Sequence, residues 1–101
     1  MKAEVIDIRF TKSSRTTRAF ADIFIEGITI RDFRICQKKD DGKPSVRNPF
    51  TTIKDADGVI RFRQLINLPP NVEAEVDALI LGEYFRRLKE SQHETKQDLQ
   101  R

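Results

Sequence analysis

The sequence has few of the residues on which metal sites, nucleotide-binding loops and disulfide-held folds depend. It contains one cysteine (Cys36), one histidine (His93), four glycines and no tryptophan. A single cysteine excludes an internal disulfide and fits a reducing compartment, and one cysteine with one distant histidine cannot form a zinc site. Neither a phosphate-binding loop nor a dinucleotide fingerprint is present among the glycines. We therefore expect no cofactor, no metal and no small-molecule substrate. An enzyme using a Cys36–His93 pair is a remote alternative, because a histidine in a polar tail is a poor base.

Long apolar runs are also missing. The longest, residues 78–81, is far too short to cross a bilayer, and the first residues contain no apolar signal core. A formal net charge of +3 is mildly basic and does not by itself indicate a nucleic-acid partner. We expect a cytoplasmic protein with no membrane contact. It forms one domain, because 101 residues cannot build two independent cores.

Alternating apolar and polar residues predict three strands near the start of the chain, over residues 3–10, 18–26 and 28–36. A polar, basic loop over residues 11–17 joins the first two. The Glu26–Gly27 pair marks a tight reversal before the third, since glycine adopts positive φ without strain. These three segments predict an antiparallel meander.

The second half of the chain predicts a hairpin followed by a helix. Residues 37–49 are charged, rich in turn formers and without hydrophobic period, which is typical of a loop. Residues 50–54 and 59–66 predict two strands around an Asp57–Gly58 turn. Asn71 is a good N-cap for a helix whose apolar residues recur at helical spacing, namely Val72, Val76, Leu79, Ile80, Tyr84 and Leu88.

The predicted fold is α+β, with an antiparallel meander sheet of about five strands and one C-terminal helix. The domain covers residues 1–90 and is followed by a polar, flexible tail over residues 91–101. One helix is about 10 Å wide and strands lie about 4.8 Å apart, so it covers two or three of them. The second strand nevertheless carries apolar residues on both faces, with Ile23 opposite Phe20 and Phe24. A two-fold homodimer is the favoured explanation, and a twisted sheet that wraps the helix is the alternative.

An ordered set of segments carries a family resemblance. It includes Glu4–Arg9, Arg18–Ala21 and Ile28–Ile35, then Gly42, Pro49, the Asp57–Gly58 turn with Arg61, a proline before the helix, and Glu83–Tyr84. Over about residues 3–90 the chain resembles the SpoVG family of bacterial septation and sporulation regulators. The resemblance implies a small α+β dimer that binds DNA and RNA and regulates gene expression linked to cell division or sporulation. Between residues 42 and 54 the chain is more polar than the family pattern and lacks its basic pair, so the resemblance supports the fold more than the binding surface.

Six cations are the candidate nucleic-acid contacts: Arg47, Lys54, Arg61, Arg63, Arg86 and Arg87. Arg61 and Arg63 project from the same face of one strand, and with Arg47 and Lys54 they could form a basic stripe that contacts phosphates. The alternative is a solvated face on which these arginines pair with acids such as Asp55. Arg86 and Arg87, with Lys89, either form a second basic patch or stabilise the C-terminal end of the helix.

Other polar and aromatic residues are assigned structural roles. Lys12, Arg15 and Arg18 are expected on a solvent-exposed loop, with a contact to a groove or a phosphate as the alternative. Asp32 and Arg34 are expected to form a local ion pair or hydrogen-bond network that holds the sheet. Tyr84, Phe33, Phe20 and Phe24 are expected to pack in the core.

The predicted function is a non-enzymatic, nucleic-acid-binding regulator, and the alternative is a dimeric protein-interaction module. A continuous basic surface would favour nucleic acid, whereas interruption by acids would favour the module.

Overall fold

The computed structural model describes residues 2–12, 15–38 and 42–99, with side chains described as far as residue 90. It is an α+β fold, as predicted, with six strands in two sheets and one helix. The elements in chain order are β1 (Ala3–Phe10), β2 (Thr17–Ile25), β3 (Ile28–Cys36), β4 (Ser45–Arg47), β5 (Phe50–Lys54), β6 (Ile60–Gln64) and α1 (Pro70–Leu99).

The larger sheet is an antiparallel meander in the order β1-β2-β3-β4. The first three strands and the Glu26–Gly27 reversal were predicted, and both turn residues have positive φ, 49° and 80°. The fourth strand was not predicted, because the composition of residues 37–49 is typical of a loop. β4 has only three residues and lies between Pro44 and Pro49, and it pairs on one side only, as an edge strand does.

One face of this sheet forms the core with the helix. Alternation places Ala19, Ala21 and Ile23 of β2 on that face, together with Phe33 and Ile35 of β3, all at most 2% exposed. The register shifts between Ala21 and Ile23, and Asp32 opposite this bulge has a φ of 69°. Phe33 is therefore a core residue as expected. Phe20 is only half-buried and Phe24 is exposed, so their predicted place in the core is wrong.

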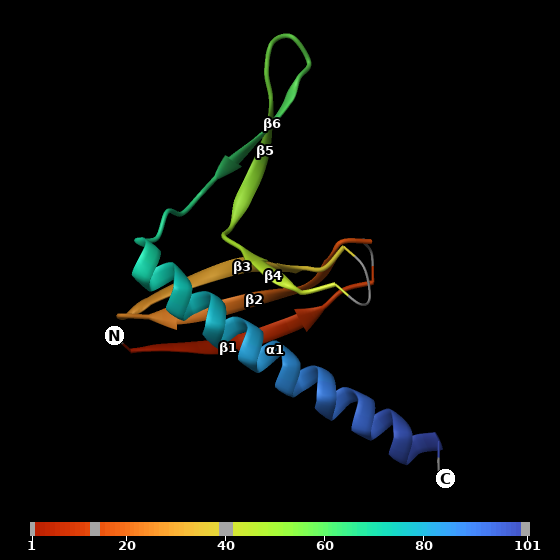
Figure 1. Cartoon of the computed structure of the whole chain (residues 1–101). Helices are drawn as coiled ribbons and strands as arrows, with labels where there is room; N and C mark the ends of the chain where they lie inside the picture. The colour runs from red at the N-terminus through yellow and green to blue at the C-terminus, as the bar shows by residue number, and fades with distance from the viewer. Residues whose placement is uncertain (1, 13–14, 39–41, 100–101) are drawn as a thin grey trace.

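The helix α1 lies across the sheet and contacts both edge strands, β1 and β4 (Figure 1). Its core residues are Val76, Ile80 and Tyr84, which confirms the helical spacing and the buried role of Tyr84. The helix begins at Pro70, where the amide of Glu73 donates to the carbonyl of Pro69 at 2.8 Å. Asn71 is thus inside the helix and is not its N-cap. Proline suits the first helical position, because its φ is already helical and its missing N–H has no partner there anyway.

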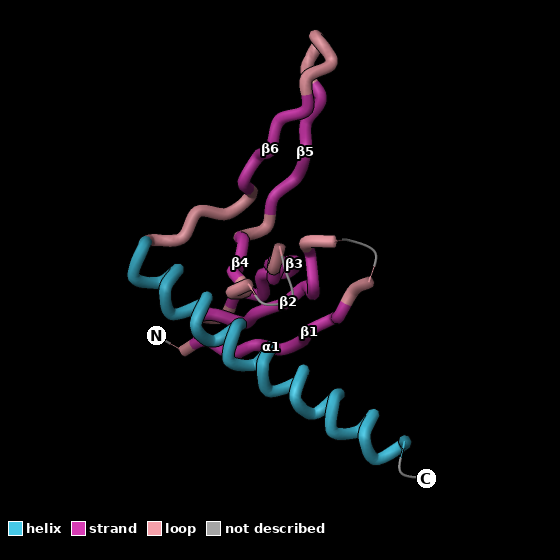
Figure 2. The backbone as a smooth tube through the Cα atoms, turned by 45° about the vertical axis from the view of Figure 1, so that its right-hand side comes forward, coloured by secondary structure: helices cyan, strands magenta, loops and turns pink. Residues whose placement is uncertain are grey.

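Two parts of the molecule extend beyond this core. The β5–β6 hairpin projects away from the larger sheet, and the last turns of α1 run past the sheet edge (Figures 1 and 2). The helical backbone continues to Leu99, so it includes most of the segment expected to be a flexible tail. In the described part of the chain, no helix has the length and apolar character needed to cross a membrane.

Candidate nucleic-acid interface

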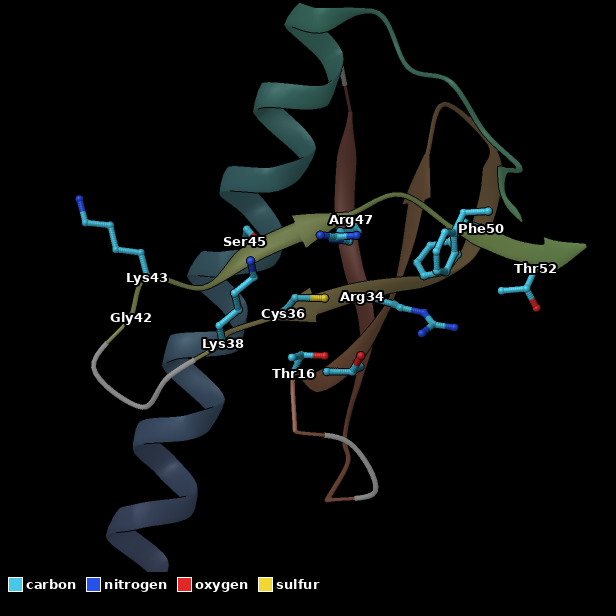
Figure 3. Close-up of a pocket in the computed structure, with 12 residues that line it drawn as sticks. Thr16, Arg34, Cys36, Lys38, Gly42, Lys43, Ser45, Arg47, Phe50 and Thr52 are labelled. Carbon is cyan, nitrogen blue, oxygen red and sulfur yellow. The ribbon is translucent and has the colours of Figure 1, made fainter. Parts of the chain in front are cut away.

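A hollow of about 720 Å³ lies between the outer face of β3–β4 and the base of the β5–β6 hairpin (Figure 3). We call it the basic hollow and define it by Arg34, Lys38, Lys43, Arg47, Phe50 and Phe62. Hydroxyl-bearing side chains, including Ser45 and Thr52, complete its lining. Cations, hydroxyls and aromatic rings therefore converge on one concave surface.

The pairing of β3 with β4 places two of these cations side by side. Arg34 lies directly opposite Arg47 in the antiparallel register. Like charges directly opposite each other destabilise a sheet. Among the described residues, the lining contains no carboxylate that would offset this repulsion, while Asp40 and Asp41 of the adjoining loop lie outside the described residues. The arrangement suits an anionic ligand better than it suits an unliganded sheet.

Aromatic rings hold Arg34 in place. Its guanidinium carbon lies 4.3 Å from the centre of the Phe50 ring and 5.4 Å from that of Phe20, within the range of cation–π contacts. The Phe50 ring in turn meets Phe62 edge-on, with their centres 5.6 Å apart. Phe62 is 75% exposed, so one ring of this group remains open to solvent at the hollow.

The structure brings only one of the six predicted cations into the basic hollow. Arg47 lines it. Lys54 does not line it, but it lies on the same hairpin face as Phe50 and Phe62, further towards the tip. Arg61 and Arg63 lie on the opposite hairpin face, since neighbouring residues of a strand alternate. Arg61 is also paired with Asp55, its Nε lying 3.2 Å from the carboxylate. The stripe proposed from the sequence is therefore divided between two faces.

The two helix cations are paired with acids. Glu83 accepts hydrogen bonds from both Arg86 and Arg87, and Arg86 also donates to Glu90 at 2.7 Å. The hydrogen bonds from the two arginines lower the pKa of Glu83 from 4.5 to about 2. Because the helix continues to Leu99, these residues lie several turns before its end. They therefore neither stabilise its C-terminus nor form an unpaired basic patch.

A second charged cluster, centred on Asp22, is saturated and structural. Asp22 is 1% exposed and accepts two hydrogen bonds from Arg9, at 2.7 and 3.0 Å, and one from Arg31 at 3.1 Å. The backbone N–H of Asp32 donates to it at 3.1 Å. These hydrogen bonds, led by that from Arg9, lower the pKa of Asp22 despite its burial. Such a carboxylate has no free lone pair with which to act as a base.

The ion pair predicted between Asp32 and Arg34 is not formed, but Asp32 does belong to a hydrogen-bond network that holds the sheet. Asp32, which has a φ of 69° at the bulge, instead pairs its carboxylate with Arg9 at 2.9 Å. Arg34 stacks on the phenyl rings. A charge network does tie the strands together, but Arg9 and Arg31 supply its cations.

Potential metal ligands and nucleophiles are scattered over the part of the chain that the structure describes. Within those ranges, no three His, Cys, Asp or Glu side chains gather as metal ligands would. Cys36 is a free, half-buried thiol at the edge of the basic hollow, and the His93 side chain lies outside the described residues. Arg18, predicted on the solvent-exposed loop, is instead half-buried in β2, and it donates to the carbonyl of Gln37 just after β3 at 3.2 Å. Residues 13–14 of that loop lie outside the described residues.

Arg34, Lys38 and Lys43 were not among the contacts predicted from the sequence. A signal was available for Arg34, because cross-strand alternation places it beside Phe20 on the face away from the core. For Lys38 and Lys43 there was none, since their approach depends on the unpredicted β3–β4 pairing. Comparison with protein-family models, curated proteins and solved structures found no match for this chain. The chemistry of the basic hollow is therefore the basis for a functional proposal.

Proposed function

We propose that this protein is a nucleic-acid-binding regulator that binds its DNA or RNA in the basic hollow. In this proposal it acts as a cytoplasmic homodimer without catalysis, in processes of the septation or sporulation type that the SpoVG resemblance implies. The observation that carries the proposal is the facing pair Arg34–Arg47, which has Lys38 and Lys43 beside it and no described carboxylate in the lining.

Each part of the lining has a role in this proposal. Arg47, Lys38 and Lys43 neutralise backbone phosphates, which supplies affinity without sequence choice. Ser45 and Thr52 donate hydrogen bonds to phosphate or sugar oxygens. The exposed ring of Phe62 stacks on a base, and such stacking contributes about 1–3 kcal/mol per base in single strands.

Fluorescence anisotropy with labelled duplex DNA, single-stranded DNA and single-stranded RNA tests the proposal. Affinity should fall steeply as salt rises from about 50 to about 200 mM, because bound phosphates release counterions. The double variant Lys43→Gln/Arg47→Gln should bind more weakly, with the salt slope reduced by about one for each phosphate that is no longer neutralised. Both side chains are exposed, so the fold should survive.

Arg86→Gln/Arg87→Gln is the matched control, because it also removes two positive charges, from cations already paired with Glu83. It should bind like the unaltered protein. Flat titrations at low salt would refute the proposal, and an equal loss in the control would show that net charge rather than the basic hollow governs binding. The duplex and single-strand arms separate the possible nucleic-acid ligands.

One observation favours the alternative, a protein-interaction module. Acids pair with Arg61, Arg86 and Arg87, so the six predicted cations do not form one uninterrupted surface. Under this alternative, oligonucleotides of every class would fail to bind in the titrations above. A protein would then occupy the exposed apolar residues of the hairpin.

A further inference from the structure

The β5–β6 hairpin, residues 50–64, is unusually exposed for a part of a folded protein. It forms a sheet of only two strands, and in Figure 2 it projects away from the larger sheet and the helix, while its base contacts β3 through Phe50 and Arg34. Ile60 is 63% exposed and Phe62 75%, and Ile53 and Val59 are also exposed. An isolated two-stranded hairpin is marginally stable in water, so this segment needs a further partner.

We propose that β5 pairs with β5 of a second copy of this chain, antiparallel across a two-fold axis at Thr52. The result is a four-stranded ribbon in the order β6-β5-β5-β6. This inference rests on the homodimer named in the proposed function and specifies its interface, but it does not require nucleic-acid binding.

The backbone of β5 is ready for such pairing. The amide of Asp55 donates to Val59 at 3.0 Å and that of Leu65 to Pro49 at 2.9 Å. Antiparallel alternation then makes Thr51–Arg63 and Ile53–Arg61 the internally bonded pairs. The N–H and C=O groups of Phe50, Thr52 and Lys54 consequently point outward, along an edge that contains no proline.

Charge selects this edge over the other one. A two-fold axis at Thr52 places Thr51 opposite the partner's Ile53 and Phe50 opposite the partner's Lys54, so no like charges meet. On β6, an axis at Phe62 would place Arg61 opposite the partner's Arg63, and an axis at either arginine would place it opposite its own copy. Like charges directly opposite each other are destabilising. When each strand is centred on its middle residue, the β5 register therefore avoids like-charge pairs and the β6 register does not.

The pairing also determines on which side of the ribbon the two basic hollows open. The two-fold axis runs perpendicular to the ribbon, so the faces that carry Phe50 and Phe62 in both copies lie on the same side. Because these two residues line the basic hollow, both hollows open towards that side. Each hairpin tip lies beside the base of the partner's hairpin, and the partner's Lys54 adds a cation next to Phe50. The dimer would thus offer one polynucleotide two adjacent sites.

The test is the oligomeric state without nucleic acid, measured by sedimentation velocity across a concentration series. The unaltered chain should be dimeric. Thr52→Lys and Thr52→Glu should each raise the dimer Kd by at least about tenfold, because each places like charges at the axis. An equimolar mixture of the two variants should recover the dimer. Gln64→Lys is the control, since it adds the same charge to the same face on β6.

Several outcomes would overturn the interface. They are a monomeric unaltered chain, a Thr52→Lys variant that dimerises normally, or a Gln64→Lys control that is equally disrupted. If the lysine variant unfolds, Thr52→Cys in a Cys36→Ser background decides the matter. It should form a disulfide-linked dimer, because Cα atoms in such a pair lie about 5.5 Å apart. Absence of that crosslink would refute the pairing. An intact dimer that binds no oligonucleotide would refute the proposed function alone.

Discussion

Asp22 joins the first three strands through its buried carboxylate. It binds Arg9 of β1 and both Arg31 and the Asp32 amide of β3. Asp22→Asn should lower the free energy of unfolding by about 2 kcal/mol at pH 7, a value below that of fully buried pairs because Arg9 is half exposed. Urea unfolding at several pH values measures the difference.

The pH dependence of this effect has a definite sign. Because the fold lowers the pKa of Asp22, its stabilisation is present above the ordinary value of 3.8 and is lost as the pH falls through the lower, folded value. The difference in the free energy of unfolding between the variant and the unaltered protein should therefore disappear only in strong acid. A gap that grows on acidification would contradict this role.

The fold shifts the pKa of Asp77 in α1 upwards, in the opposite direction to that of Asp22. Its Oδ1 atom is buried and has no hydrogen-bond partner, and burial, followed by the nearby charge of Glu73, raises its pKa. The neutral form is the one that the fold tolerates, so stability is lost as the pH rises through this raised pKa. Asp77→Asn should increase the free energy of unfolding by about 1 kcal/mol at pH 7 and change little below pH 3.8. Glu75→Gln, close by at an exposed position, should have no such effect.

At the level of elements, the hairpin and the core should unfold separately. Gly58 closes the hairpin with a φ of 83°, where any side chain is strained. Gly58→Ala should cost the hairpin about 1 kcal/mol. Hydrogen exchange should accelerate at β5 and β6 amides and remain unchanged in β1–β3, because the hairpin supplies none of the buried core cluster.

Gly82→Ala is the matched change within the helix. An added Cβ there meets nothing within 4 Å, and alanine is the better helix former, so the free energy of unfolding should rise by about 0.5–1 kcal/mol.

The hydrogen-exchange result for Gly58→Ala could contradict separate unfolding. If that variant lowered the protection of amides throughout β1–β3, the hairpin would belong to the same cooperative unit as the core.

At the level of the whole molecule, the helix is longer than the sheet that it covers. The residues of α1 that pack on or against the core run from Val72 to Leu88, and the remaining turns project past the sheet (Figure 1). Deleting residues 92–101 should therefore change the free energy of unfolding by less than about 1 kcal/mol, in the range of substitutions away from the core. Ile80→Ala in the full chain should cost about 2–5 kcal/mol, because it leaves a cavity in the core. Thermal unfolding of both proteins measures the contrast, and a deletion as costly as Ile80→Ala would show that the projecting turns are part of the folded core.

Local pattern was sufficient to predict the elements whose physics is local. Apolar residues alternate in β1, β2 and β3, and they recur at helical spacing at Val76, Ile80 and Tyr84, so each pattern has the period of its own element. The Glu26–Gly27 turn is likewise specified by two neighbouring residues. β4 was not predicted, because three residues between prolines are too few to show a period. The helix start was misplaced because Asn71 suits a cap, but Pro70 suits the first turn even better.

The periodic spacing of apolar residues in the sequence was enough to predict the fold class, the first three strands and the core face of the helix. Which cations lie together depended on the folded chain. Strand pairing set Arg34 against Arg47, and the two faces of the hairpin separated Arg61 and Arg63 from them. The bulge at Asp32 directed one acid into the Asp22 cluster and left Arg34 to the aromatic rings. Charges attract, repel or stack according to distance and direction, and both depend on how segments far apart in the chain are paired.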